Sequence, residues 1–391
     1  MPNLRHIALL VPVSREYGRG ISQGVASYAL ERGDWVIFPQ RSDFKELPAW
    51  LTRTRIDGII GFIDSPELGQ QLMALGVPIV DVQGKGNCPT APVYDTDPVQ
   101  VARFAGDFFI HAGFTQFGFC GYPGVFFSDR RSEAYCDYLQ SRGQGVHVYA
   151  PASSAMGVQD NLYREWGALE YENQLTGWLT RVPKPIAILA CNDIRGQQLI
   201  HACRDLGISM PSDVAVIGVD NDEIICRQCR PTLSSIAPDT ERIGRLAAET
   251  LTRMMDGETV EPMLANQPPT RIVERQSTDI TMTQDPIVLA ASRFIRNRVC
   301  DDISVDQVCE LVDCSRSTLD GLFKKHLGRP VAQEMRRVRL NRATRLLLDS
   351  PLTVEDVARE CGFRSATYFC RFFKRETGTT PVLYRNGKSR R

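Results

Sequence analysis

The stretch SRSTLDGLFKKHLG, residues 315–328, returns fifty positions later as SATYFCRFFKRETG, residues 365–378. Both copies begin with a serine, continue with apolar residues at helical spacing, and end with two basic residues and a glycine. Each copy follows a shorter amphipathic pattern, SVDQVCELV from Ser304 and TVEDVAREC from Thr353. The order of short helix, tight turn and second helix is that of a helix-turn-helix unit. The sequence therefore predicts an all-α region that contains two such units.

Charge is divided unevenly along the chain. The sequence holds 46 Lys and Arg against 46 Asp and Glu, but 21 of the basic and 13 of the acidic residues lie from Asp285 onward, which leaves 25 basic and 33 acidic residues before it. A basic module joined to an acidic one is typical of a DNA-binding domain attached to a domain that does not bind DNA. The alternative for any single arginine is a solvated helix face.

Residues from about 286 to 391 resemble the DNA-binding domain of the AraC/XylS family of transcription regulators. The run GFRSATYFCRFFKRETGTTPVLYR from Gly362 is similar to that family's C-terminal signature over its whole length. The resemblance implies recognition helices at 315–326 and 365–376 that enter successive major grooves of double-stranded DNA. Because the first helix contains a glycine at an implied reading position, we expect the second to carry at least as much specificity. The implied base-facing residues are Arg316, Ser317, Asp320 and Gly321 in the first helix and Arg364, Thr367 and Arg371 in the second.

The preceding residues alternate short apolar runs with helical stretches. Among the runs are HIALLVPV from His6, AILAC from Ala187 and VAVIGVD from Val214. Apolar strands between helices of ten or more residues indicate parallel sheets covered on both faces. The sequence therefore predicts an α/β domain of two doubly wound lobes over residues 1–280, followed by the all-α domain over residues 286–391. The boundary is expected within QSTDITMTQDP, where apolar periodicity lapses.

Polar residues follow several of the apolar runs, at the strand ends where doubly wound sheets bind ligands. Carboxylates accept hydrogen bonds from sugar hydroxyls, arginine donates to them, and an aromatic ring covers the apolar face of a sugar. The alternative for each aspartate is that it caps the helix that follows. Recurrence at several strand ends favours binding. The residues predicted to contact a ligand are Tyr17, Asp64, Arg131, Asn192, Asp193, Asp220 and Asn221.

Residues 7–278 resemble the periplasmic-binding-protein-like ligand domain of the LacI family. The motifs CNDIRG, PSDVAVIGVDND and RIVERQST carry this resemblance. In that family an arginine, the Asn-Asp pair of the first motif and the aspartate of the VIGVD run contact the effector. The resemblance thus implies effector contacts for Arg131, Asn192, Asp193 and Asp220.

Together the two resemblances imply a sugar-responsive transcription regulator. The order of domains resembles the family of xylose-responsive operon regulators, which implies D-xylose as the effector, gene activation, a homodimer on paired DNA sites and RNA polymerase as a partner. Strand-end polarity alone does not distinguish xylose from another sugar, and repression is the alternative to activation. We expect sugar binding to close the two lobes and to shift a dimer toward a geometry that fits adjacent half-sites.

Motifs of other protein classes are incomplete. GRGISQG from Gly18 contains GxSxG, but Ser22 lies several residues past the preceding apolar run, whereas a nucleophile elbow needs a sharp turn directly off a strand. The same run lacks the G-x-G-x-x-G spacing of a dinucleotide site. We therefore predict no catalytic residues. The alternatives are a sugar- or NAD-dependent enzyme fused to a DNA reader and a ligand-independent architectural DNA protein.

The twelve cysteines lack the spacing of a disulfide framework, and several lie in apolar runs, which is typical of buried thiols in a reducing compartment. Cys226 and Cys229 form a lone CxxC without partners at zinc spacing, so we expect no metal and no cofactor. The N-terminus has only about seven consecutive apolar residues, too few for a membrane span or a signal sequence. We expect a cytoplasmic protein without membrane contact.

Overall fold

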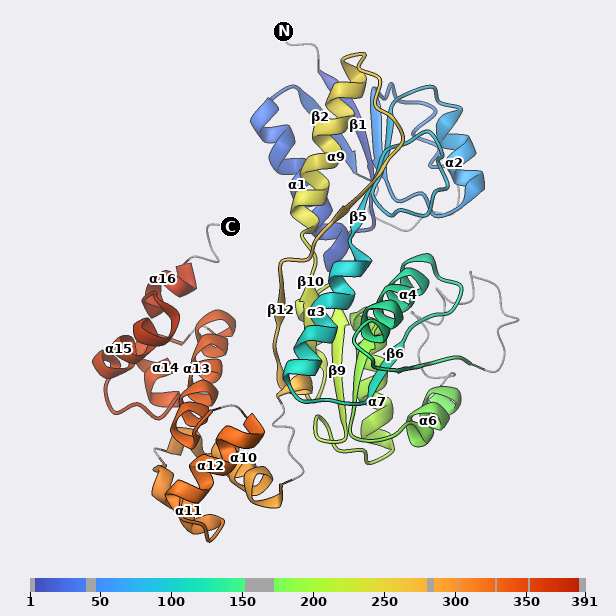
Figure 1. The fold of residues 1–391 in the computed structure, drawn as a ribbon. Helices are drawn as coiled ribbons and strands as arrows, with labels where there is room; N and C mark the ends of the chain where they lie inside the picture. Colours follow the sequence, from blue (N-terminus) through green and yellow to red (C-terminus); the bar gives the residue numbers. More distant parts are fainter. Residues whose placement is uncertain are drawn as a thin grey trace. The chain divides into compact units, whose positions relative to one another are not determined.

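The computed structural model describes residues 4–39, 47–151, 172–279, 285–301, 303–327, 329–350 and 352–386. They form two compact units, one within Met1–Ile280 and the other within Thr281–Arg391. The segment predicted to hold the domain boundary includes residues 280–284, which lie outside the described part. The first unit is α/β and the second is helical, so the predicted fold class is confirmed (Figure 1).

The first lobe of the α/β unit is built on a parallel six-stranded sheet in the order β11-β5-β4-β3-β1-β2. Successive side chains of β1 point to opposite faces, as in any strand. Ile7 and Leu9 pack with helices α1 (Glu16–Arg32) and α9 (Thr240–Met255), whereas Ala8 and Leu10 pack with α2 (Pro66–Met73). The strands are β1 (Arg5–Leu10), β2 (Trp35–Pro39), β3 (Gly58–Gly61), β4 (Ile79–Asp81), β5 (Val93–Thr96) and β11 (Leu264–Gln267).

The second lobe has a sheet in the order β12-β10-β9-β8-β6-β7. The prediction of parallel pairing holds for its pairs except β10 with β12, which is antiparallel. Its strands are β6 (Phe117–Cys120), β7 (Val146–Val148), β8 (Ile186–Ala190), β9 (Val214–Val219), β10 (Ser234–Ala237) and β12 (Arg271–Val273). Its helices are α3 (Pro98–His111), α4 (Phe126–Gln140), α6 (Glu172–Arg181), α7 (Asp193–Asp205), α8 (Glu223–Gln228) and the 3-10 turn η1 (Gln276–Thr278).

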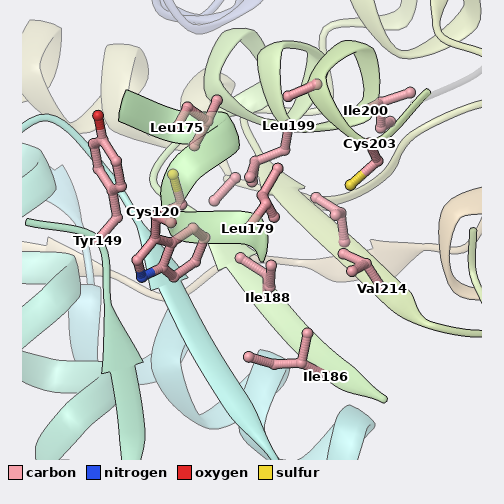
Figure 2. Close-up of a cluster of buried hydrophobic side chains, with 14 of the residues drawn as sticks. Cys120, Tyr149, Leu175, Leu179, Ile186, Ile188, Leu199, Ile200, Cys203 and Val214 are labelled. Atoms are coloured by element: carbon pink, nitrogen blue, oxygen red, sulfur yellow. The ribbon is translucent and has the colours of Figure 1, made fainter. Parts of the chain in front are cut away.

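One face of this second sheet is covered by α6 and α7. Figure 2 shows Leu175 and Leu179 of α6 and Leu199 of α7 gathered over Ile188 of β8, and all four side chains are buried. Apolar residues at helical spacing on α6 and α7 thus meet the continuous apolar run of β8, as expected for a buried parallel strand. This core fixes the strand ends of β8 and β9, from which the polar residues extend.

The chain passes between the two lobes at three places. These are between β5 and α3, between β10 and α9, and between β11 and β12. The last passage returns the chain to the second lobe, where β12 leads into η1 and then toward the helical unit. Both short strands of the first lobe that lie at these passages, β5 and β11, were absent from the prediction.

The helical unit has two cores that share one long helix, α13 (Val331–Asp349). Val331 and Met335 of α13 pack in the first core, and Ala343 and Leu347 pack in the second. The first core also holds α10 (Pro286–Arg298), the 3-10 turn η2 (Val299–Asp301), α11 (Val305–Leu311) and α12 (Arg316–Leu327). The second holds α14 (Val354–Glu360), α15 (Ala366–Thr377) and α16 (Pro381–Asn386).

Candidate effector site and nucleic-acid interface

Tyr17 and Asp95 meet at the carboxyl end of the first sheet. Tyr17 lies in the first turn of α1, and Asp95 lies in β5. The Tyr17 hydroxyl donates to Asp95 Oδ1 at 3.1 Å and accepts from Thr96 Oγ1 at 3.3 Å, and its ring packs edge-on against Phe62 with 6.1 Å between the ring centres. Burial, followed by the charge of Asp95, raises the pKa of Tyr17 well above its usual value. The hydroxyl therefore stays protonated and remains a donor.

Arg130 reaches this pair from the second lobe. Its Nη1 donates to Asp95 Oδ2 at 3.2 Å, and its Nη2 donates to Asn266 Oδ1 of β11 at 3.4 Å. The guanidinium carbon lies 5.2 Å from the centre of the Phe126 ring. Burial raises the pKa of Asp95, although Arg131 and Arg130 oppose the shift. The contacts of Arg130 therefore connect α4 of the second lobe to two strand ends of the first.

Arg131, the next residue of α4, connects two strand ends within the second lobe. Its side chain is buried, and its Nη1 donates to the Cys191 carbonyl at the end of β8 at 2.5 Å. Its Nη2 lies 3.9 Å from Asp220 Oδ1, one residue past β9. The guanidinium carbon lies 5.4 Å from the centre of the Phe127 ring. The structure thus brings together Arg131 and Asp220, which the sequence placed far apart along the chain.

Rings, carboxylates and guanidinium groups from both lobes form this candidate effector site, which we define by Tyr17, Asp95, Arg130, Arg131 and Asp220. Each of the two carboxylates is matched by an arginine, so the set has no excess of either charge. Such groups accept from and donate to hydroxyls, and the rings offer apolar faces. The arrangement suits a neutral polyol, whereas an anionic ligand would need unmatched basic groups.

Asn192 and Asp193 have structural roles that the sequence did not distinguish from effector contacts. Asn192 caps α7, where its Oδ1 accepts from the Arg195 N–H at 2.9 Å. Asp193 is buried, with Oδ1 accepting from Ser235 Oγ at 2.5 Å and Oδ2 accepting from the Asp222 N–H at 2.7 Å. The helix-cap alternative is thus observed for Asn192, and both oxygens of Asp193 hold neighbouring loops in place.

The buried carboxyl of Asp193 also explains one glycine of the VIGVD run. A Cβ built on Gly218 would overlap Asp193 Oδ1, so a larger residue at that position would displace the carboxylate. Burial, followed by the charge of Asp220, raises the pKa of Asp193 well above its usual value. Asp193 is therefore an internal support for the loops that carry the candidate site.

Asp64 and Asn221 make contacts outside the candidate effector site. Asp64 Oδ1 accepts from Lys85 Nζ at 2.6 Å, and its side chain is 45% exposed. Asn221 Oδ1 accepts from Arg275 Nη2 at 2.8 Å. The backbone φ angles of Asp220 and Asn221 are 104° and 50°, which non-glycine residues seldom adopt. Strand-end position predicted the neighbourhood of these residues but not the direction of their side chains.

Sequence reasoning missed Asp95 and Arg130. Asp95 lies in a strand of four residues between Pro92 and Pro98, which is too short and too polar to stand out as an apolar run. The available signal was Val93 and Tyr94, two residues with high strand propensity, followed by the helix cap Asp97. Arg130 was overlooked because the family resemblance pointed only to its neighbour.

The GxSxG run is part of a helix interface. Ser22 lies within α1 rather than on a turn after a strand. A Cβ on Gly20 would overlap Thr240 Oγ1, and a Cβ on Gly24 would overlap Glu241 O, so these glycines allow α1 and α9 to approach closely. Helix packing accounts for the glycine spacing that resembled a catalytic or nucleotide-binding motif.

Cys226 and Cys229 are buried thiols in α8 and at its end. Cys226 Sγ donates to Asp193 Oδ2 at 3.4 Å, and Cys229 Sγ donates to the Ile225 carbonyl at 3.2 Å. Within the described ranges, no group of three or more His, Cys, Asp and Glu side chains is placed to hold a metal ion. These same residues also include no helix long and apolar enough to span a membrane.

In both helix-turn-helix units a serine or threonine caps the start of each helix. Ser304 accepts from the Gln307 N–H, and Thr353 accepts from the Asp356 N–H, at the starts of α11 and α14. The recognition helices α12 and α15 begin one residue later than predicted, because Ser315 and Ser365 serve as their caps. Side-chain oxygens thereby satisfy backbone donors that each helix leaves unpaired in its first turn.

Six of the predicted base-facing residues are exposed on the helical unit. Apolar residues of the same helices, including Leu319, Phe323 and Phe369, are buried in the two cores. Asp320 differs, because its Oδ1 accepts from the Val331 N–H at 3.0 Å and so caps α13. For this reason Asp320 is unsuited to contact a base. Gly321 is exposed, with open space around a built Cβ. Besides Gly321, the exposed residues are Arg316, Ser317, Arg364, Thr367 and Arg371.

Comparison with known proteins gives matches along the chain. Residues 6–96 match the XylR N-terminal domain, residues 107–278 a periplasmic binding protein-like domain, and residues 308–387 a helix-turn-helix domain. The Xylose operon regulatory protein of Escherichia coli K12 is 31% identical over 98% of this chain and 98% of its own. This chain belongs to the xylose operon regulatory protein family. Its relatives in that family are transcription regulators, so the prediction of a DNA-binding regulator rather than an enzyme is confirmed.

Other members and solved structures agree with this family. The Xylose operon regulatory protein of Haemophilus influenzae is 30% identical over 97% of each chain. The solved structure of the xylose-binding transcription activator XylR matches with a TM-score of 0.70 and 30% identity, and the match covers 99% of each chain. A transcriptional regulator CelR–cellobiose complex matches with a TM-score of 0.54 and 24% identity over 71% of this chain and 86% of its own, which shows likeness of fold alone.

Proposed function

We propose that this chain is an activator of transcription whose effector is D-xylose. The observation that carries the proposal is the end-to-end similarity to xylose operon regulatory proteins. The solved structure that matches over 99% of each chain is that of a xylose-binding transcription activator. The matched charges of the candidate effector site support a neutral sugar, because a phosphorylated sugar would need unmatched basic groups.

The effector contacts that we propose differ in part from the residues that the sequence suggested. Asp193 is omitted because both of its oxygens accept internal hydrogen bonds, and Asn221 is omitted because its Oδ1 accepts from Arg275. Asp95 and Arg130 are added, because they join the two lobes beside Tyr17. The proposed contacts are Tyr17, Asp95, Arg130, Arg131, Asn192 and Asp220, with Asp64 as a further acceptor at the edge of the first lobe.

Thermal unfolding against a panel of pentoses and hexoses tests the effector. A ligand at 100 times its dissociation constant stabilises the unit that binds it by about 2.7 kcal/mol. We expect D-xylose to raise the unfolding temperature of the α/β unit, and Asp220→Asn to remove that shift. Asparagine tolerates the positive φ of residue 220, so the variant tests the charge rather than the backbone. A shift with another sugar and none with D-xylose would overturn the choice of effector.

Recognition of DNA is proposed for Arg316, Ser317, Arg364, Thr367 and Arg371, with α15 as the main reader. We expect Arg371→Ala to reduce discrimination at one base pair by about 1–3 kcal/mol. Lys374→Ala, on the same helix and also exposed, is the matched control and should weaken binding to specific and random DNA alike. An unchanged ratio of specific to random binding in Arg371→Ala would contradict its assignment.

We further propose that the protein acts in the cytoplasm as a homodimer on paired half-sites and contacts RNA polymerase. We expect a dimer because the two-fold symmetry of paired half-sites mirrors that of a dimer, so that each subunit reads one half-site. Transcription in vitro with purified RNA polymerase, with and without D-xylose, tests activation directly. A decrease in transcript on adding sugar-loaded protein would indicate repression instead. Sedimentation of the protein on DNA with one and two half-sites tests the dimer.

A further inference from the structure

Three consecutive residues past β9 each contact a different arginine. We call residues 220–222 the junction segment. Its three partners come from different parts of the α/β unit: one from the candidate effector site, one from the first lobe, and one from the end of β12. The pairs are Asp220 Oδ1 with Arg131 Nη2 at 3.9 Å, Asn221 Oδ1 with Arg275 Nη2 at 2.8 Å, and Asp222 Oδ2 with Arg19 Nη2 at 3.0 Å.

The contact with Arg19 connects the junction segment to the opposite lobe. Asp222 is buried, and its Oδ2 also accepts from the Glu16 N–H of α1 at 3.1 Å. Its Oδ1 accepts from the Ile224 N–H at 3.1 Å and caps α8. One carboxylate therefore holds a helix start of the second lobe and a helix start of the first. Separation of the lobes would break the Arg19 and Glu16 contacts together.

The contact with Arg275 connects the junction segment to the chain that leaves for the helical unit. Arg275 is buried, and its Nη1 donates to the Leu233 carbonyl at 2.9 Å. Its backbone N–H donates to Ser234 Oγ at 2.7 Å. Ser277, two residues later, donates to the Val216 carbonyl of β9 at 2.7 Å. Arg275 thus stands where the last segment of the α/β unit is fixed to the sheet, ten residues before Asp285, the cap of α10.

The backbone of the junction segment is held in a conformation that it would rarely adopt unaided. The φ angles of Asp220 and Asn221 are 104° and 50°. Their N–H groups donate to the Ile236 carbonyl and to Ser235 Oγ, both at 3.0 Å. Non-glycine residues in this region persist only where the surroundings over-determine them. Loss of one anchor therefore favours a second arrangement of the segment, which is the property that a switch requires.

We propose that the junction segment couples sugar binding and lobe closure to the position of Arg275, and through it to the chain that leads to the DNA-binding unit. The inference rests on the proposed function. A sugar beside Arg131 and Asp220 acts on one end of the segment, and the closed lobes act on the other through Arg19. Asn221 and Arg275 are positioning residues, since they transmit the change and do not touch the effector. A ligand shifts such an equilibrium only by its difference in affinity for the two arrangements.

Two variants of the full chain break the central contact in different ways. Asn221→Gly removes the acceptor within the junction segment, leaves the 3.2 Å contact of Arg275 Nη2 with Glu223 Oε1, and keeps the positive φ without strain. Arg275→Lys keeps the charge but loses the planar fork that reaches Asn221 and Leu233 together. Arg271→Lys is the matched control, because Arg271 lies in β12 four residues before Arg275 and its side chain is exposed. Calorimetry with D-xylose reports effector binding, and a fluorescent operator fragment reports DNA affinity with and without D-xylose.

Wild type and Arg271→Lys should show a D-xylose effect on the DNA dissociation constant in the usual range of about 5- to 150-fold. In Asn221→Gly and Arg275→Lys this ratio should fall to within about twofold of one, while D-xylose still binds. By reciprocity, the effect of DNA on the D-xylose dissociation constant should vanish by the same factor in both variants. A purely structural role would weaken both affinities and leave the ratio unchanged.

Either of two results would overturn the inference alone. One is an undiminished ratio in both variants, and the other is loss of D-xylose binding in both, which would place Asn221 and Arg275 in the effector site. Wild-type protein that binds no D-xylose would instead overturn the proposed function, and the inference with it. The measurement on wild-type protein therefore distinguishes failure of the inference from failure of the proposed function.

Discussion

At the scale of single residues, Asp95 makes one of the contacts between the lobes. One of its oxygens accepts from Tyr17 and the other from Arg130. Asp95→Asn keeps the size of the side chain but removes the charge that both donors meet. Hydrogen bonds to charged groups contribute about 1.5–3 kcal/mol, so we expect D-xylose to bind about 10- to 100-fold more weakly, as measured by calorimetry.

A matched control for this change is Asp34→Asn. Asp34 accepts from Arg32 Nη2 at 2.9 Å just before β2, outside the candidate effector site. D-xylose affinity should remain at the wild-type value in this variant. Equal affinities in Asp95→Asn and Asp34→Asn would remove Asp95 from the proposed contacts.

The buried carboxyl of Asp81, at the end of β4, should make the free energy of unfolding depend on pH. Burial raises its pKa to about 7, with the charges of Asp95 and Asp64 adding to the shift against the opposing N–H bonds of Gln83 and Gly84. Because the folded pKa exceeds the unfolded one, the stabilisation from the protonated carboxyl is complete below about pH 4 and is lost as the pH rises through 7. Asp81→Asn should lack this loss, because a neutral amide resembles the protonated acid.

The measurement is the free energy of unfolding of the α/β unit for wild type and Asp81→Asn between pH 4 and pH 8. The variant should gain relative to wild type by about 1.4 kcal/mol for each pH unit in this window, to a total of about 2–4 kcal/mol. The difference should level off above pH 7. A constant difference across the window would show that Asp81 ionises normally in the folded protein.

What the sequence predicted about single residues was their place and not their direction. Arg131 and Asp220 were both expected to contact the effector, and the structure places Arg131 Nη2 and Asp220 Oδ1 3.9 Å apart. Asn192 and Asp193 satisfy the same rule of strand ends, but one caps a helix and the other is enclosed by Ser235 and Asp222. A sequence pattern cannot separate these cases, because a carboxylate that supports a site and one that lines it occupy adjacent positions.

At the scale of elements, two helix glycines predict opposite effects of the same substitution. Gly24 of α1 lies against α9, where an added Cβ would overlap Glu241 O, whereas a Cβ on Gly321 of α12 meets open space. Gly24→Ala should therefore destabilise the α/β unit by about 1–3 kcal/mol through overpacking. Gly321→Ala should stabilise the helical unit by about 0.5–1 kcal/mol, because alanine restricts the unfolded chain and favours helix.

Denaturant unfolding of each unit measures both effects, with the wild-type chain as the reference. A stabilising effect of Gly24→Ala would show that helix propensity outweighs packing at the contact of α1 and α9. The comparison is sharp because the chemistry of the change is identical and only the surroundings differ.

Helices could be predicted where the spacing of apolar residues is regular over a long stretch of sequence. The repeat placed α12 and α15 to within one residue, because amphipathic spacing and serine caps agree in both copies. The strands β5 and β11 were missed because each has four residues and because β11 joins the edge of the sheet through β5. Their pairing joins segments about 170 residues apart, which no local pattern can reveal.

At the scale of the whole molecule, the neutral total charge hides a basic helical unit. Its phosphate contacts should make DNA affinity fall with salt, with a slope of about −0.9 per phosphate neutralised on a logarithmic plot. Arg336 is exposed on α13 and is not among the proposed base contacts. Arg336→Ala should therefore reduce the slope by about one and leave sequence discrimination unchanged. A salt titration of operator binding measures the slope, and an unaltered slope would place Arg336 away from the backbone of DNA.

Two resemblances, one for each end of the chain, predicted the whole architecture, because each rests on long motifs. The passages of the chain between lobes were not predictable in the same way. The third passage returns β12 antiparallel to β10, and this pairing depends on the sheet that is already formed.

Because both cores of the helical unit include residues of α13, the length of this helix sets the distance between the two reading helices. Its 19 residues span about 28 Å, close to the 34 Å of one turn of DNA. Arg339 holds α13 near its middle. It donates to the Val299 carbonyl at 3.0 Å, and its guanidinium carbon lies 5.6 Å from the centre of the Phe363 ring. Adding one residue to α13 would turn one reading helix by about 100° relative to the other. Operators for proteins of this build can therefore diverge in base sequence far more readily than in the spacing between the two stretches that are read.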